Sequence, residues 1–139
     1  MKEILLDTNI LLDLLARRIP FYDEAAELFS LADKKIIGLS FSSLSLINTH
    51  FVLRKFKSES DTRKILRSFK LLVKVLSLDD KIVNLALNSD FKDFEDAIQY
   101  FTAIENSQEL IVSRNLSGFR NSKIPVMTAR ESIESLLDD

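Results

Sequence analysis

Short apolar segments alternate with amphipathic helical segments along the whole chain. The apolar segments are typical of strands covered on both faces, and they lie at residues 3–7, 36–41, 73–78, 109–113 and 124–127. Helices are expected at residues 9–16, 21–34, 43–56, 60–72, 79–88, 93–106 and 129–138. Strands that alternate with helices in this way form a parallel sheet between helical layers. The pattern therefore predicts an α/β fold, a three-layer α/β/α arrangement with a five-stranded parallel sheet.

Local signals mark the ends and faces of some helices. Asn9 is expected to cap the helix that follows the first strand. The helix at 43–56 is expected to face the core with Leu44, Ile47 and Phe51. The helix at 93–106 is the most periodic, and its expected core-facing residues are Phe94, Ala97, Ile98, Phe101 and Ile104.

The composition is that of one folded, soluble domain spanning residues 1–139. Hydrophobic residues make up 46% of the chain and charged residues 29%, which is enough apolar material for a core. The chain has no cysteine, which excludes disulfides and thiolate metal sites, and its single histidine, His50, excludes multi-histidine sites. No apolar run could cross a membrane, and the N-terminus lacks a signal-peptide pattern, so a cytoplasmic location without membrane contact is expected.

The net charge is only −2, but the charges are distributed unevenly. Eight basic side chains fall in one central stretch: Arg54, Lys55, Lys57, Arg63, Lys64, Arg67, Lys70 and Lys74. Residues 79–96 instead carry six acidic side chains against two lysines. Two interpretations stay open, namely two solvated helical faces of opposite sign, or a basic rim beside an acidic pocket.

Polar residues follow two of the expected strands at their carboxyl ends. Asp7 completes the first strand segment, and Asn115 comes just after the fourth. The carboxyl ends of parallel strands meet at one edge of an open α/β sheet, where functional groups gather. Two further candidates lie on helices. Asp96 shares a flank of its helix with Asp93, and Asn48 lies on a face that should be apolar.

Each candidate also has a purely structural interpretation. An acid in the first turn of a helix, such as Asp96, is favoured by the helix dipole, and a buried amide such as Asn48 can bridge helices. His50 is expected to be packed or exposed rather than catalytic, and Ser42 or Ser43 is better explained as a helix cap than as a nucleophile. Carboxylates that cluster without histidine or cysteine are best explained by a hard divalent cation, Mg²⁺ or Mn²⁺.

Four segments, in this order, resemble the PIN-domain family, and most closely its VapC-like toxin ribonucleases of bacterial type II toxin–antitoxin pairs. They are LLDTNILLDLL, SFSSLSLINTHFVLRK, DFEDAIQYFTA and IVSRNLSGF, and the resemblance covers nearly the whole chain. The resemblance implies the PIN-like five-stranded parallel sheet and metal-dependent cleavage of RNA with Mg²⁺ or Mn²⁺. It further implies a cognate antitoxin and a homodimer.

The resemblance also assigns roles to individual residues. Asp7 and Asp96 match metal-binding acids of the family, and Ser113 matches its small hydroxyl residue. Asn48 stands where the family normally has a glutamate, and Asn115 where it normally has an aspartate. Each lost charge weakens attraction to a cation by roughly 1–4 kcal/mol at effective dielectric constants of 20–80. The implied catalytic set is Asp7, Asn48, Asp96 and Asn115, with Asp7, Asp96 and Asn115 on a weakly bound metal.

Under this hypothesis the basic residues of 54–74, together with Arg114, hold backbone phosphates of RNA. Two other functions stay open. A PIN-like module that binds RNA or protein without cleaving RNA would still bind in EDTA. A phosphatase of the HAD type would form an aspartyl phosphate on Asp7, because Asp7 and Asn9 are similar to a strand-end D-x-D motif, although the second aspartate is missing here.

Overall fold

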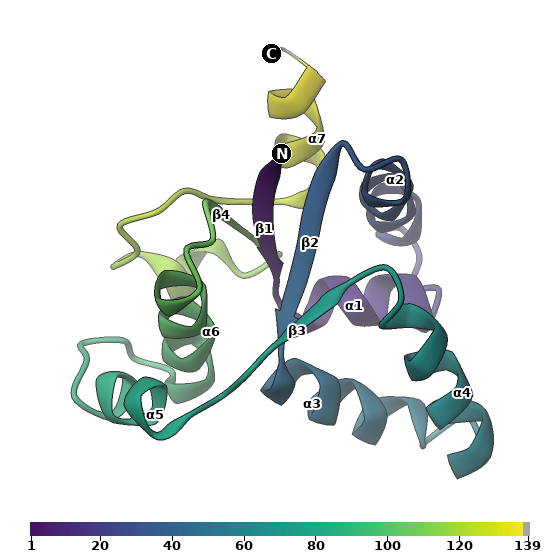
Figure 1. Ribbon diagram of the computed structural model, residues 1–139, viewed down its shortest axis with the longest axis horizontal. Helices are drawn as coiled ribbons and strands as arrows, with labels where there is room; N and C mark the ends of the chain where they lie inside the picture. Colours follow the sequence, from purple (N-terminus) through teal and green to yellow (C-terminus); the bar gives the residue numbers. More distant parts are fainter. Residues whose placement is uncertain (138–139) are drawn as a thin grey trace.

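The computed structural model describes residues 1–137. The strands are β1 (Lys2–Leu6), β2 (Ile37–Ser42), β3 (Lys74–Leu76), β4 (Leu110–Val112) and β5 (Val126–Met127). The helices are α1 (Thr8–Leu15), α2 (Tyr22–Asp33), α3 (Ser43–Leu53), α4 (Glu59–Phe69), α5 (Asp80–Leu87), α6 (Phe94–Glu105), the 3₁₀ helix η1 (Leu116–Phe119) and α7 (Ala129–Leu137). The strands form one parallel sheet in the order β3–β2–β1–β4–β5 (Figure 1), which confirms the predicted fold.

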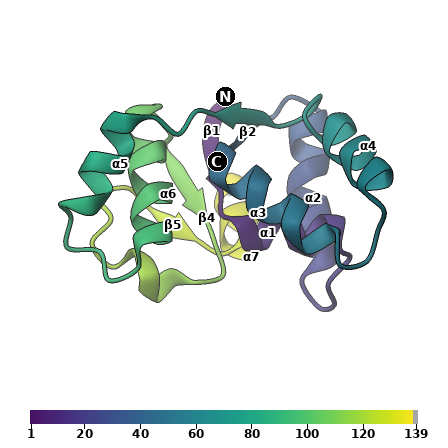
Figure 2. The same ribbon diagram turned by 90° about the horizontal axis from the view of Figure 1, so that it is seen from below.

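Helices cover both faces of this sheet (Figures 1 and 2). On one face, residues of α1, α2, α4 and α7 pack against Ile4 and Leu6 of β1. On the other face, α6 packs against Leu5 and Ile111 through Tyr100, and α5 packs against α6. Consecutive residues of β1 thus point to opposite faces, and both faces are buried. This is why β1 is a continuous apolar run and not an alternating one.

Helix α3 faces the core with a different side from the expected one. Its buried residues are Ser45, Thr49 and Leu53. Ile47 and Phe51, which were expected in the core, are 65% and 66% exposed. The Ser45 hydroxyl forms hydrogen bonds to side chains of α1 and α6, so hydrogen bonding rather than apolar periodicity sets the rotation of α3.

The expected apolar stripe of α6 is only partly buried. Ala97 and Ile98 are buried, but Phe94 and Ile104 are 47% and 37% exposed. The helix also buries Asp96, Gln99, Tyr100, Thr102 and Ala103. This second buried side packs on the sheet, while Ala97 and Ile98 face α5. Contact with both the sheet and α5 therefore widens the buried surface beyond one stripe.

Several elements are shorter than predicted. Strands β3, β4 and β5 have three, three and two residues, and α3 and α4 end at Leu53 and Phe69. The predicted end of the last helix, residue 138, lies outside the described residues. Over residues 1–137, none of the helices has the length and apolar character needed to cross a membrane.

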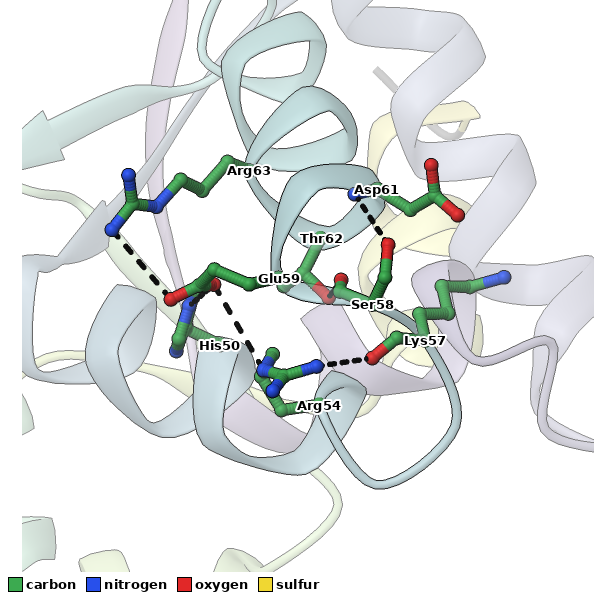
Figure 3. Close-up of polar contacts among 8 residues, drawn as sticks. All are labelled: His50, Arg54, Lys57, Ser58, Glu59, Asp61, Thr62 and Arg63. Carbon is green, nitrogen blue, oxygen red and sulfur yellow. Dashed lines mark hydrogen bonds and ion pairs between the residues drawn. The ribbon is translucent and has the colours of Figure 1, made fainter.

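The turn between α3 and α4 is held by polar contacts around Glu59 (Figure 3). The atoms His50 Nε2 and Glu59 Oε2 lie 2.5 Å apart, and Arg63 Nη2 lies 3.6 Å from Glu59 Oε1. Arg54 donates a hydrogen bond to the Lys57 carbonyl at 2.7 Å. The hydrogen bond with His50, followed by the charges of its neighbours, lowers the pKa of Glu59. Arg54 and Arg63 of the central basic stretch therefore stabilise this turn.

The rotation of α3 can be tested with two substitutions on the same helix. Leu53→Ala removes a fully buried side chain and should cost about 2–5 kcal/mol of unfolding free energy. Ile47→Ala removes an exposed one and should change that free energy by less than about 0.5 kcal/mol. Urea unfolding of both variants measures the difference. A large loss for Ile47→Ala would instead support the apolar side expected from the sequence.

Candidate active site

Asp7 lies at the carboxyl end of β1, in the middle of the sheet. The chain moves from β1 to β2 and β3 on one side and then to β4 and β5 on the other, so the strand order reverses between β1 and β4. Open α/β sheets bind ligands at such a point. Asp7 is buried, and its Oδ1 accepts the Thr8 N–H at 2.8 Å. Asp7 is therefore the N-cap of α1, and the capping role expected of Asn9 is wrong.

A chain of hydrogen bonds joins Asp7 to Asp96. The Ser113 hydroxyl donates to Asp7 Oδ2 at 2.7 Å and accepts the Asn115 N–H at 2.9 Å. The Asn115 side-chain amide then donates to Asp96 Oδ2 at 3.2 Å. Three segments far apart in the sequence thus meet at one place, and two of the four predicted site residues carry their carboxylates to it.

Helix α6 presents Asp96 through its own N-cap. Asp93 precedes the helix, and its Oδ1 accepts the Asp96 N–H at 3.0 Å. Burial, and then the negative charges of Asp7, Asp93 and Glu95, raise the pKa of Asp96 to about 6. Burial also raises the pKa of Asp7, against the hydrogen bond from Ser113, which lowers it. The site is therefore an anionic cluster in which ionisation is unfavourable without a cation.

Asn48 is less closely connected to these residues. It is half-buried on α3, and its side chain has no hydrogen-bond partner among residues 1–137. One turn earlier, the Ser45 hydroxyl lies 2.8 Å from that of Thr8 and accepts the Gln99 amide at 2.8 Å. Ser45 thus links α3 to Thr8, the residue after Asp7, and to Gln99 of α6.

A cavity of about 400 Å³ opens beside Asp96 and Asn115. Lys92 and Arg120, both exposed, supply its positive charge. Helix α4, which carries Arg63, Lys64 and Arg67, lies on the opposite side of the molecule from α6 (Figures 1 and 2). None of the eight residues of the central basic stretch lines the cavity. The central basic stretch is therefore not the rim of this cavity. Lys92 lies within the acidic stretch and Arg120 is isolated, so charge clustering in the sequence did not reveal them.

Gly118 is a further residue that the sequence interpretation missed. It lies in η1, packed against the side chains of Asp96 and Asn115. A Cβ atom at this position would collide with Asp96 Oδ2 and would lie 2.6 Å from Asn115 Nδ2. The absence of a side chain is thus what lets η1 approach the Asp96–Asn115 pair. The chain has only two glycines, so their scarcity was a usable signal.

Arg114 does not have the position expected of a phosphate contact. Its guanidinium forms two hydrogen bonds to Asp13, from Nε to Oδ2 at 2.9 Å and from Nη2 to Oδ1 at 3.0 Å. Asp13 was not predicted, although it lies among leucines on a buried helix. A buried carboxylate in such surroundings needs a partner, and that requirement was the available signal.

The donor atoms suit one hydrated divalent cation. No group of three or more acidic or histidine side chains arranged to hold a metal occurs in the described part of the chain. Mg²⁺, however, is commonly bound by one or two carboxylates, with water and phosphate oxygens completing its shell. Asp7 and Asp96 provide two carboxylates. The Asn115 amide oxygen accepts the Ser117 hydroxyl at 3.2 Å, so it would reach an ion beside Asp96 only after the amide turns over. A cation here would also relieve the repulsion that raises the pKa of Asp96.

Comparison with solved structures finds similar chains among toxin–antitoxin proteins. A toxin–antitoxin complex from Klebsiella pneumoniae is 25% identical, with 91% of this chain and 97% of that chain covered and a TM-score of 0.67. FitAcB from Neisseria gonorrhoeae is 17% identical, with coverages of 91% and 98% and a TM-score of 0.68. VapC20 from Mycobacterium tuberculosis, a sarcin–ricin loop cleaving toxin, is 16% identical, with coverages of 78% and 86% and a TM-score of 0.60.

Comparison with curated protein sequences finds no match. A family model described as PIN domain matches residues 3–117, which is most of the chain and includes all four predicted site residues. This match confirms the resemblance inferred from the sequence segments. The chain belongs to the PIN-domain family.

Proposed function

We propose that this chain is a divalent-metal-dependent endoribonuclease and the toxin of a toxin–antitoxin pair. The supporting observation is the meeting of Asp7 and Asp96 where the strand order reverses, joined through Ser113 and Asn115. Similar structures include a toxin–antitoxin complex and a toxin that cleaves the sarcin–ricin loop. Under this proposal the substrate is RNA and the cofactor is Mg²⁺ or Mn²⁺. The partners are a cognate antitoxin and a second copy of the chain. The chain acts as a single domain in the cytoplasm.

Each side chain at the site would have its own role in this reaction. Asp7 and Asp96 would hold the ion through carboxylate oxygens. Asn115, whose amide nitrogen faces Asp96 in the structure, would turn its amide oxygen to the ion. A bound ion polarises a phosphoryl oxygen and makes water easier to ionise. Ser113 fixes the orientation of Asp7 by donating to Oδ2. Lys92 and Arg120 at the cavity would attract the phosphates of the RNA backbone.

A catalytically weakened module that binds RNA or protein is the second candidate. The observation in its favour is the low carboxylate count, because Asn48 and Asn115 carry no charge and no third acid completes a metal cluster within residues 1–137. Binding of RNA that persists in EDTA, without cleavage in Mg²⁺ or Mn²⁺, would support this module over the nuclease.

The nuclease proposal predicts the effect of removing each carboxylate. The purified chain should cleave RNA in Mn²⁺ and stop in EDTA. Asp7→Asn and Asp96→Asn should each lower the cleavage rate about 100-fold or more, because each removes a charge that would hold the ion. Cleavage of a labelled RNA, followed by gel electrophoresis, measures the rate.

The matched control is Asp33→Asn, which makes the same chemical change at an exposed position on α2. Its cleavage rate should equal that of the wild type. Equal cleavage by the wild type, Asp7→Asn and Asp96→Asn would contradict the site assignment.

The electrostatics of the site predict that Asp96→Asn stabilises the metal-free protein at pH 8. The folded-state pKa of about 6 lies above the ordinary value of 3.8. Ionised Asp96 therefore destabilises the folded state above pH 6, and this cost disappears as the pH falls towards 4. The difference between the two pKa values corresponds to about 3 kcal/mol, so we expect a gain of about 1–3 kcal/mol at pH 8.

Urea unfolding in EDTA at pH 8 and pH 4 measures this gain in unfolding free energy. Mg²⁺ should then raise the midpoint of the wild type more than that of Asp96→Asn, because binding to the folded state stabilises it. If Asp96→Asn gains no unfolding free energy at pH 8, or gains the same amount at both pH values, the folded state does not raise the pKa of Asp96.

A further inference from the structure

Arg114 connects the loop after β4 to helix α1. It lies between Ser113 and Asn115 in the chain, but its side chain turns to Asp13 instead of lining the cavity. Nε donates to Oδ2 at 2.9 Å and Nη2 donates to Oδ1 at 3.0 Å. Both carboxylate oxygens thus take part in a two-point contact, which fixes orientation as well as distance.

This ion pair is enclosed by the surrounding residues. The Asp13 side chain is 1% exposed and the Arg114 side chain 30%. The Arg114 guanidinium carbon also lies 3.9 Å from the centroid of the Phe21 ring, within the range of a cation–π contact. The buried Asp13 carboxylate and the Phe21 ring therefore hold the guanidinium in one place.

We propose that Asp13 and Arg114 are positioning residues of the candidate active site. Helix α1, which carries Asp13, begins directly after its N-cap Asp7. The Asp13–Arg114 contact ties this helix to the loop that carries Ser113 and Asn115, and so keeps the Ser113 hydroxyl against Asp7. The inference rests on the proposed function, because it assigns these two residues to the nuclease site.

Direct contact with an RNA phosphate is the competing role for Arg114. Its charge, however, is compensated by Asp13 and one face of its guanidinium is covered by Phe21. Lys92 and Arg120 instead are exposed at the cavity. A phosphate contact adds to the salt dependence of RNA binding, whereas a positioning residue does not. The two roles therefore predict different kinetics.

Arg114→Lys keeps the charge but loses the two-point contact. We expect kcat for RNA cleavage in Mn²⁺ to fall about 10- to 100-fold, while KM stays within about twofold and keeps its salt dependence. Asp13→Asn should have the same effects on kcat and KM. The double variant Asp13→Asn/Arg114→Lys should have a kcat no lower than that of the slower single variant, because the two substitutions break the same contact. The control Arg130→Lys alters the more exposed pair with Glu24 and should change none of these values.

Hydrogen exchange tests the same claim without RNA or metal. The Asn115 amide donates to Ser113 Oγ at 2.9 Å. Arg114→Lys should speed its exchange about tenfold or more, while the amide of Ile111 in β4 exchanges as in the wild type. Equal acceleration at both amides would mean general destabilisation and would overturn the proposal.

The kinetic outcomes separate the competing roles. Arg114→Gln removes the charge as well as the two-point contact, and a higher KM with a weaker salt dependence at unchanged kcat in this variant would make Arg114 a phosphate contact and overturn the positioning role. If kcat, KM and the exchange rate of the Asn115 amide are all unchanged, Asp13 and Arg114 only stabilise the fold and the positioning role is wrong. If the wild type cleaves no RNA, the proposed function fails, and the exchange of the Asn115 amide still decides whether Arg114 holds the loop.

Discussion

The hydrogen bond from the Ser113 hydroxyl to Asp7 is the contact on which the candidate site depends. It joins the ends of β1 and β4, neighbouring strands that are also linked by the Asp7 N–H and the Val112 carbonyl at 2.9 Å. Because Ser113 also accepts the Asn115 N–H, the same hydroxyl orients the residue that contacts Asp96. The parallel register of two central strands therefore places the polar groups of three segments together.

This arrangement carries an electrostatic cost in the absence of a cation. Asp7 and Asp96 are both buried, and burial is the first cause of the rise in each pKa. Asn48 and Asn115, which the sequence resemblance aligns with acids of the family, carry no charge and do not add to the repulsion.

The fold and part of the site follow from local features of the sequence. Alternating apolar runs and helices predict the parallel sheet, and the strand-end rule brings Asp7 and Asn115 to one edge. The rotation of α3 was not predictable from apolar spacing, because Ser45 buries a hydroxyl that bonds across to α1 and α6. The partner of Arg114 was not predictable either, because it lies 101 residues away on α1.

The central claim is that Asp7 and Asp96 form one cation site. Anomalous diffraction from crystals grown with Mn²⁺ tests it most directly, because the signal locates the metal independently of any assumed function. The account predicts a single strong peak about 2.0–2.2 Å from a carboxylate oxygen of each aspartate. A peak elsewhere, or no peak at saturating Mn²⁺ in a crystal that leaves both carboxylates accessible, would contradict it.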